Sequence, residues 1–237
     1  MKKTLLLFGL ALLTLTSCHK DDSNDIDSFN ENLIAYYPFN GNSMNDVGSN
    51  HNGLVDGATL TSDINASDNS AYFFNGIDNA IRVNHDNVFN LSNEFTISVL
   101  VKADEIKTQT IIRKGETVNG PGTWPYGIEL SITGDIVFTV TTENGNSINQ
   151  VRKSGYLTNE WYLITGVFKD STMFLYVNGQ LEATTTVSGL VNTNTDPLLI
   201  GTRLSIPSST FKGIIDEVRI YDAALNASDI QDLYNSL

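Results

Sequence analysis

The stretch Phe211-Lys212-Gly213-Ile214-Ile215-Asp216-Glu217-Val218-Arg219-Ile220-Tyr221, near the end of a 237-residue chain, predicts a long β-strand. Side chains alternate between the two faces of a strand, so Asp216 is expected to share a face with the apolar residues two positions away on either side. Glu217 and Arg219 are expected to pair on the other, wetter face. A carboxylate among apolar neighbours is costly unless it finds donors or a cation, so Asp216 needs a partner.

The chain upstream of this stretch also reads as β-structure. Asn and Gly tolerate the positive φ that tight hairpin turns require. Short runs rich in Val, Ile, Thr, Tyr and Phe lie between six Asn-Gly pairs and predict strands. The pairs are Asn40-Gly41, Asn52-Gly53, Asn75-Gly76, Asn119-Gly120, Asn144-Gly145 and Asn178-Gly179. With no Pro/Ser-rich linker and no internal repeat, the sequence predicts one all-β sandwich from residue 31 onward.

Two kinds of strand are expected within this sandwich. Residues 95–101 and 128–132 alternate apolar with polar side chains, which predicts strands with one apolar face. Residues 161–168 and 173–177 are apolar on both faces, so these strands are expected near the middle of a sheet.

The C-terminal tail departs from the β pattern. Asn226 followed by Asp229 resembles a capping box, which marks the start of a helix. Ile230, Leu233 and Tyr234 then recur at helical spacing. The sequence therefore predicts a short amphipathic helix that packs against the sandwich.

The N-terminus carries the signature of an exported protein. Two lysines follow Met1, residues 4–15 are apolar, and the run Leu15-Thr16-Ser17-Cys18 resembles a bacterial lipobox. The apolar run is shorter than the roughly 20 residues that a membrane-spanning helix needs. We expect residues 1–17 to be a lipoprotein signal peptide and Cys18, the only cysteine, to be the lipid attachment site. The alternative is an ordinary secreted protein with an incidental cysteine.

Residues 18–30 are expected to form an acylated cysteine and a flexible tether. The segment is polar and charged, so it buries too little apolar surface to fold. The start of the tether, Cys18-His19-Lys20-Asp21-Asp22, resembles an export signal of some Gram-negative surface lipoproteins. We therefore expect an outer membrane lipoprotein exposed on the cell surface, with a periplasm-facing anchor as the alternative.

Charge narrows the range of partners. The chain has 14 Lys and Arg against 27 Asp and Glu, a net charge of −13. Removal of residues 1–17, which hold two lysines and no acidic residue, takes the net charge to −15. Nucleic acid is not an expected partner because no basic stripe is visible. Membrane contact is expected only through the lipid anchor. The oligomeric state is left open.

The chain resembles laminin-G-like domains, the concanavalin A-like jelly rolls of many secreted bacterial proteins. Matching segments occur in order along almost the whole mature chain. They are residues 37–42, 71–81, 95–98, 160–162, 175–179 and 211–221. The resemblance implies a two-sheet antiparallel jelly-roll sandwich over residues 31–237 with a short C-terminal helix. It does not imply one activity, because this fold carries lectins, glycan hydrolases, adhesion modules and structural domains.

The same resemblance implies a possible structural calcium ion. Related domains often hold one between a loop near the N-terminus and a carboxylate of the last strand. Residues 40–48 supply carboxylate, amide and carbonyl oxygens, which suit a hard cation. Asn42, Asp46 and Asp216 are the expected ligands. The alternative for Asp216 is a carboxylate satisfied by backbone N–H groups.

No catalytic constellation is evident. Retaining glycan hydrolases of this fold place two carboxylates on one face of a strand, about 5 Å apart. Asp216 and Glu217 are adjacent, so they are expected on opposite faces unless a bulge intervenes. Glu129 has no acidic neighbour at the required spacing, and the chain has no zinc, phosphate-loop or nucleophile-elbow motif. We expect a binding protein rather than an enzyme, with a glycoside hydrolase as the less favoured alternative.

Glycan capture or adhesion is the expected function, and the alternative is a structural or extracellular protein-binding domain. Sugar rings stack on exposed aromatic side chains, and loops on a rigid scaffold often carry function. The loop 120–126 contains Trp124 and Tyr126, which we expect to form a stacking pair. The competing expectation is that Trp124 folds back over a sheet edge. The loop 203–208 is a second surface with an apolar pair but little chemistry.

Overall fold

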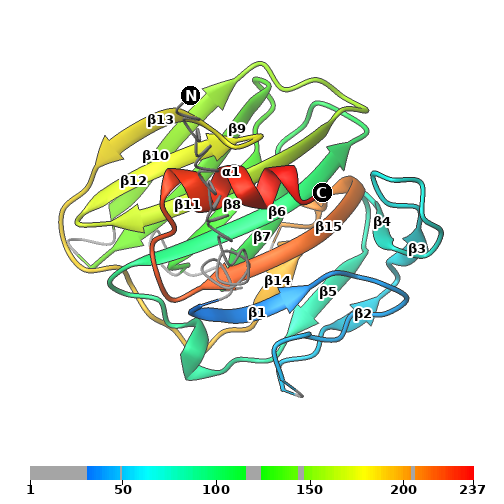
Figure 1. Cartoon of the computed structure of the whole chain (residues 1–237), viewed down its shortest axis with the longest axis horizontal. Coiled ribbons are helices and arrows are strands. Elements are labelled where there is room, and N and C mark those ends of the chain that lie inside the picture. Colours follow the sequence, from blue (N-terminus) through cyan, green and yellow to red (C-terminus); the bar gives the residue numbers. More distant parts are fainter. Residues whose placement is uncertain (1–30, 49, 116–123, 144–146, 204–205) are drawn as a thin grey trace, which may run out of the picture.

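Two antiparallel β-sheets form the body of the protein in a computed structural model that describes residues 31–48, 50–115, 124–143, 147–203 and 206–237 (Figure 1). The strands are β1 (Leu33–Tyr37), β2 (Leu54–Asp56), β3 (Thr59–Thr61), β4 (Ala71–Asn75), β5 (Ala80–Val83), β6 (Phe95–Ala103), β7 (Gln109–Lys114), β8 (Tyr126–Leu130), β9 (Asp135–Thr142), β10 (Ser147–Ser154), β11 (Trp161–Lys169), β12 (Thr172–Val177), β13 (Gln180–Thr186), β14 (Leu198–Ile200) and β15 (Lys212–Tyr221). Two 3₁₀ turns (Asn87–Phe89 and Pro207–Ser209) and one helix, α1 (Ala227–Asn235), complete the fold.

The two sheets differ in strand order. The eight-stranded sheet runs β13-β12-β11-β6-β15-β4-β3, with β1 also paired to β15. The seven-stranded sheet runs β10-β9-β8-β7-β14-β5-β2. Neighbours that are distant in sequence, such as β14 beside β7, bring separate segments of chain onto one surface. The expected all-β sandwich with a C-terminal helix is confirmed.

The main hydrophobic core lies between the inner faces of the sheets. Phe95 of β6 is central to it, with ring centroids 5.3 Å from Tyr126, 6.3 Å from Phe138 and 5.5 Å from Phe168. Gly166 in β11 permits this packing, because a Cβ at that position would lie 2.6 Å from the Phe138 ring. The expected alternation along residues 95–101 is confirmed, since its apolar members are core residues.

A β-bulge changes the expected faces of β15. Asp216 pairs with Leu100 and Arg219 pairs with Ser98, so three steps along β15 match two along β6. Glu217 takes up the extra residue with φ of 51°. Val218 consequently faces the core, whereas Asp216 and Arg219 face outward. The prediction that Asp216 and Val218 share a face is therefore wrong, because a local alternation rule does not include the bulge.

The helix α1 covers the outer face of the eight-stranded sheet (Figure 1). Asn226 caps its N-terminus, and Asp229 accepts a hydrogen bond from the backbone N–H of Asn226, which confirms the predicted capping box. Ile230 and Leu233 are buried in a second hydrophobic cluster with residues of β6, β11 and β12. Tyr234 is more exposed than its spacing suggested. Within the described residues, no helix is long and apolar enough to cross a membrane.

The packing of α1 predicts unequal effects of two neighbouring substitutions. Leu233 is fully buried and Tyr234 is 38% exposed. Leu233→Ala is expected to lower the free energy of unfolding by about 2–4 kcal/mol, because it leaves a cavity under the helix. Tyr234→Ala is expected to cost less than about 1 kcal/mol. Urea unfolding measures both values, and equal losses would contradict the described packing.

Candidate functional site

Trp124 lies on the outer face of the seven-stranded sheet, just before β8, and is half-buried. The guanidinium carbon of Arg113, from β7, lies 4.0 Å from the centroid of the indole ring. The guanidinium carbon of Arg203, which follows β14, lies 5.0 Å from the same ring. Each contact has the geometry of a cation–π interaction, worth roughly 0.5–2 kcal/mol depending on desolvation. Two arginines from separate segments therefore hold the position of the indole.

A small hollow lies on this sheet face beside the indole. We call it the Trp124 hollow, and its lining residues come from β7, β8 and β9 as well as Trp124 itself. They are Thr110, Ile112, Arg113, Trp124, Gly127, Ile128, Glu129 and Thr139. The free space in the hollow is on the order of one water molecule. Hydroxyl, carboxyl and guanidinium groups thus meet in a narrow space beside an aromatic ring.

Arg113 is an unusual member of this set. Its side chain is 3% exposed, and its Nε donates to the carbonyl oxygen of Gly115 at 3.1 Å. Its Nη2 is buried without a hydrogen-bond partner among the described residues. Burial and, second, the positive charge of Arg203 lower the pKa of Arg113 to about 9, while the negative charges of Glu129 and Asp196 oppose the shift. The guanidinium stays protonated at neutral pH, and its Nη2 has no acceptor among the described residues.

Glu129 is the acidic residue of the Trp124 hollow. Burial raises its pKa, while Arg113, Arg203 and Arg152 oppose that rise. Gln150 Nε2 donates to Glu129 Oε1 at 3.3 Å. Three guanidinium groups therefore act electrostatically on this carboxyl group, which in turn offsets part of the charge of Arg113 and Arg203.

Tyr126 does not join Trp124 in a stacking pair. It begins β8 with its side chain in the core, fully buried, and its hydroxyl donates to the carbonyl oxygen of Phe89 at 2.8 Å. The alternation of Tyr126 with the core residues Ile128 and Leu130 explains this inward direction. The expectation for Tyr126 is wrong, and Trp124 is left as the aromatic side chain of the site. Residues 120–123 of the same predicted loop lie outside the described residues.

A second polar pocket, of about 350 Å³, lies on the outer face of the other sheet. Asp216 and Glu217 both line it, because the bulge brings these adjacent carboxyl groups to one side. The hydroxyl of Tyr36 donates to Glu217 Oε2 at 2.9 Å, and Arg219 forms the expected ion pair with Glu217. The guanidinium carbon of Arg219 lies 4.1 Å from the Tyr36 ring centroid. Glu217 is thus held by two partners.

Asp216 is buried in this second pocket. Its Oδ1 accepts a hydrogen bond from the backbone N of Glu217 at 2.8 Å. Burial raises the pKa of Asp216 to about 8, and the negative charges of Glu217 and Asp63 contribute in the same direction. The backbone hydrogen bond agrees with the alternative expected for this carboxylate, although it satisfies only one of its two oxygens.

The other two expected calcium ligands lie on the loop beside β1. Asn42 and Asp46 are both exposed. Asn42 Oδ1 accepts from the backbone N of Met44 at 2.8 Å, and the backbone N of Asp46 donates to the carbonyl oxygen of Tyr36 at 2.8 Å. Across the described residues, no three His, Cys, Asp or Glu side chains gather closely enough to hold a metal ion. The calcium site stays a prediction, with Asp216 as its one buried acidic group.

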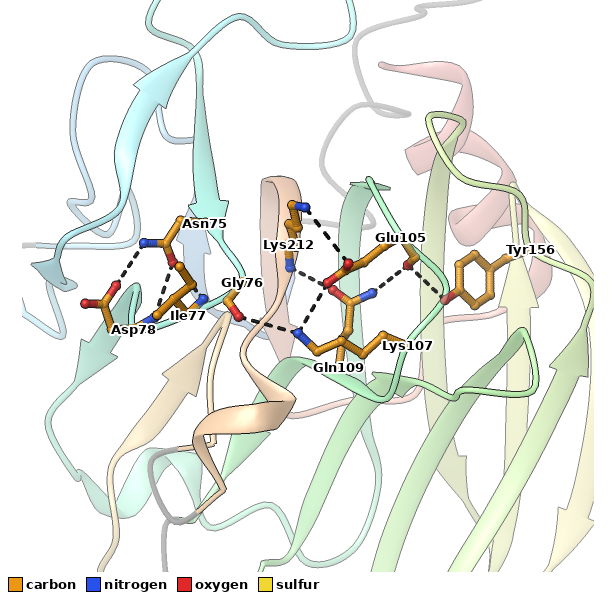
Figure 2. A network of polar contacts seen from close by, with 9 residues as sticks. All are labelled: Asn75, Gly76, Ile77, Asp78, Glu105, Lys107, Gln109, Tyr156 and Lys212. Carbon is orange, nitrogen blue, oxygen red and sulfur yellow. Dashed lines mark hydrogen bonds and ion pairs between the residues drawn. The ribbon is translucent and has the colours of Figure 1, made fainter.

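A third polar cluster ties loops together at one end of the sandwich (Figure 2). Gln109 is its centre, donating to the carbonyl oxygen of Glu105 at 2.8 Å and accepting from the backbone N of Lys212 at 2.7 Å. Lys107 bridges the Glu105 carboxylate at 3.2 Å and the carbonyl oxygen of Gly76 at 3.4 Å. Donors and acceptors match here, so this cluster is structural.

Sequence reasoning singled out Trp124 but missed three of the groups around it. Arg113 and Glu129 occupy outward positions on strands, and Arg203 was included only as the first residue of a loop with little chemistry. Residues 204 and 205 of that loop lie outside the described residues. An available signal was the presence of arginines at outward strand positions in a chain of net charge −13.

Comparison with known proteins identifies the family. A family model described as the concanavalin A-like lectin/glucanases superfamily matches residues 74–231. Adhesion G-protein coupled receptor V1 of Danio rerio is 28% identical over 151 residues, which cover 60% of this chain and 2% of that receptor. The match to the receptor therefore concerns a very small part of it.

Solved structures show the same fold. The binding domain of Paraclostridial Mosquitocidal Protein 1 aligns with a TM-score of 0.72 at 19% identity, covering 88% of this chain and 53% of that chain. Domain 4 of AbnA, an arabinanase from Geobacillus stearothermophilus, in complex with arabinotriose, aligns with a TM-score of 0.67 at 23% identity. The alignment covers 85% of this chain and 98% of that chain. The binding domain of botulinum neurotoxin DC in complex with SialylT aligns with a TM-score of 0.66 at 21% identity. The alignment covers 88% of this chain and 52% of that chain. The chain spans about half of each toxin domain.

The raised pKa of Asp216 predicts how stability depends on pH. An unfolded aspartate ionises near pH 3.9, whereas folded Asp216 keeps its proton up to about pH 8. The stabilising contribution of Asp216 to the free energy of unfolding is therefore fully present below about pH 4. It is lost as pH rises toward 8, and the loss is on the order of a few kcal/mol. Asp216→Asn is expected to remove this dependence. Urea unfolding across this pH range, with a chelator present, measures it, and parallel profiles for the two proteins would contradict the prediction.

Proposed function

Because the chain belongs to the concanavalin A-like lectin/glucanases superfamily, we propose that it binds carbohydrate on the outer face of its seven-stranded sheet, around Trp124. The observation that carries this proposal is the half-buried indole, held on the outer face of the sheet and surrounded by polar groups. Sugar rings stack on such aromatic faces while neighbouring polar groups meet their hydroxyls. The solved complexes of domain 4 of AbnA with arabinotriose and of the neurotoxin domain with SialylT support a sugar ligand for this fold.

The proposed activity is binding without hydrolysis. Hydrolysis by a retaining or inverting mechanism uses two carboxyl groups that flank the glycosidic bond. Of the described residues lining the Trp124 hollow, Glu129 is the only carboxylic acid. In the second pocket, Glu217 is already engaged by Arg219 and Tyr36. Neither arrangement favours catalysis.

A protein-binding or purely structural role is the second candidate. Arg113 covers part of the indole at 4.0 Å, which favours the expectation that Trp124 folds back onto the sheet. In that case the indole would seal the sheet face, and its removal would lower stability without any loss of sugar binding.

The proposed place of action is the outer surface of a Gram-negative cell. Residues 1–30, which include Cys18 and the tether, lie outside the described residues. The proposal rests on the resemblance of residues 15–18 to a lipobox and on the charged stretch that follows. A lipid-anchored domain on a polar tether would reach extracellular glycans or proteins without contact between the domain and the membrane.

Trp124→Ala tests the proposed site. The substitution is expected to remove saturable binding on a glycan array, at a cost of roughly 1–3 kcal/mol of binding free energy, because it deletes the stacking surface. Tyr234→Ala, which removes an exposed aromatic ring from α1, is the matched control and is expected to bind as the wild type. Absence of binding by the wild type across broad glycan classes would favour the second candidate.

Calcium is proposed as a structural ion, with Asp216, Asn42 and Asp46 as the residues that would hold it. A bound divalent cation would ionise Asp216 and so offset the cost of burying its carboxylate. Calcium addition is then expected to raise the melting temperature of the wild type and to leave that of Asp216→Asn unchanged. Equal melting temperatures of the wild type with calcium and with a chelator, together with no calcium in elemental analysis, would refute this part of the proposal.

A further inference from the structure

We propose that the Trp124 site selects saccharides that carry carboxylate groups, and that Arg113 and Arg203 bind the carboxylate. This inference rests on the proposed carbohydrate-binding function and names its ligand class, an acidic saccharide such as a uronic acid oligomer. The distribution of charge and the unpartnered donors around Trp124 each support it.

Positive charge is concentrated on one face of an acidic protein. Four of the five arginines of the chain lie on or beside the outer face of the seven-stranded sheet. Arg82 points outward because its neighbours on β5 face the core, and Arg152 points outward because it pairs with the outward residue Val137 of β9. Arg113 and Arg203 both contact Trp124. Arg152 is already paired with Asp135 at 3.5 Å, so Arg113 and Arg203 are the cations that would attract an anion beside Trp124.

Buried side-chain atoms without a hydrogen-bond partner also occur on the outer face of the seven-stranded sheet. Five buried side-chain atoms of the described residues have no hydrogen-bond partner, and three of them lie on this side of the molecule. These are Arg113 Nη2, Arg203 Nε and Thr141 Oγ1. Thr141 lies near Trp124 because its backbone N donates to the carbonyl oxygen of Pro125, the residue after Trp124. Buried polar groups are normally paired, so this concentration indicates a missing acceptor.

The neighbouring residue on β7 shows how a buried cation is satisfied within the chain. Lys114 is fully buried, and its ammonium donates to Asn194 Oδ1 at 2.6 Å and to the carbonyl oxygen of Asp196 at 2.5 Å. Arg113, one residue earlier, has no ion pair with a carboxylate within the described part of the chain. Lys114 is thus satisfied within the chain, whereas Arg113 keeps one buried donor, Nη2, without an acceptor among the described residues.

The geometry around Trp124 indicates how a ligand would be oriented. The hollow has room for about one water molecule, so neither a sugar ring nor a carboxylate enters it. A carboxylate substituent is small and planar, and it can accept two hydrogen bonds from a guanidinium. The sugar ring would then lie outside, against the exposed part of Trp124, with its carboxylate directed toward the two arginines.

Isothermal titration calorimetry with a matched pair of ligands tests the inference. Trigalacturonic acid and its methyl ester share rings and linkages and differ in charge. The acid is expected to bind the wild type about 10-fold or more tightly than the ester, since charge-assisted hydrogen bonds contribute roughly 1.5–3 kcal/mol. Affinity for the acid, but not for the ester, is expected to fall as ionic strength rises.

Two variants assign the effect to the site. Arg203→Gln is expected to bring the ratio of acid to ester affinity close to 1, and it is the primary variant because Arg113→Gln changes a buried residue. Lys169→Gln, which removes the same charge from the other sheet, is the control and is expected to keep the preference.

The outcomes separate this inference from the proposed function. Equal binding of acid and ester, lost in Trp124→Ala, would overturn the carboxylate preference and leave carbohydrate binding intact. Tighter binding of a sulfated trisaccharide than of the acid would overturn the assignment to carboxylate. If neither trigalacturonic acid, its ester nor neutral and sulfated saccharides bind, the proposed function fails and the inference fails with it.

Discussion

Arg113 is a buried cation in the middle of an exposed sheet face, and its surroundings set the chemistry of the site. Strand pairing of β7 with β8 and β14 fixes its backbone, while Trp124 covers its guanidinium. A buried charge without an ion-pair partner is costly, so the rest of the sandwich must supply the stability that keeps it there. A preformed group of this kind binds its counterion without first losing a protein partner, which favours affinity and selectivity.

The two outer faces of the sandwich have different surroundings. On the eight-stranded sheet, α1 covers the apolar outer residues of β6, β11 and β12, so much of that face is occupied by the protein itself. On the seven-stranded sheet, the region around Trp124 carries arginines, threonines and a carboxyl group instead of a second apolar layer. This asymmetry explains why the strand segments 161–168 and 173–177 are apolar on both faces, whereas β8 and β9 are polar on their outer side.

Local sequence patterns predicted the elements better than the site. Alternation along residues 95–101 and the capping box at Asn226 depend on neighbours in the sequence, so they could be predicted directly. The same alternation applied to Tyr126, Ile128 and Leu130 would have predicted an inward Tyr126. The bulge at Glu217 was harder to predict, because it appears only as a mismatch between β15 and β6. The meeting of Trp124, Arg113 and Arg203 depends on the nonlocal pairing of β7 with β14, which no short motif encodes.

A crystal structure of the protein with trigalacturonic acid would test the central claim most directly. The account predicts that a ligand carboxylate lies within hydrogen-bond distance, about 2.7–2.9 Å, of the guanidinium groups of Arg113 or Arg203, with a sugar ring against Trp124. A well-defined ligand bound to the other sheet, with both arginines still lacking an anionic partner, would contradict it.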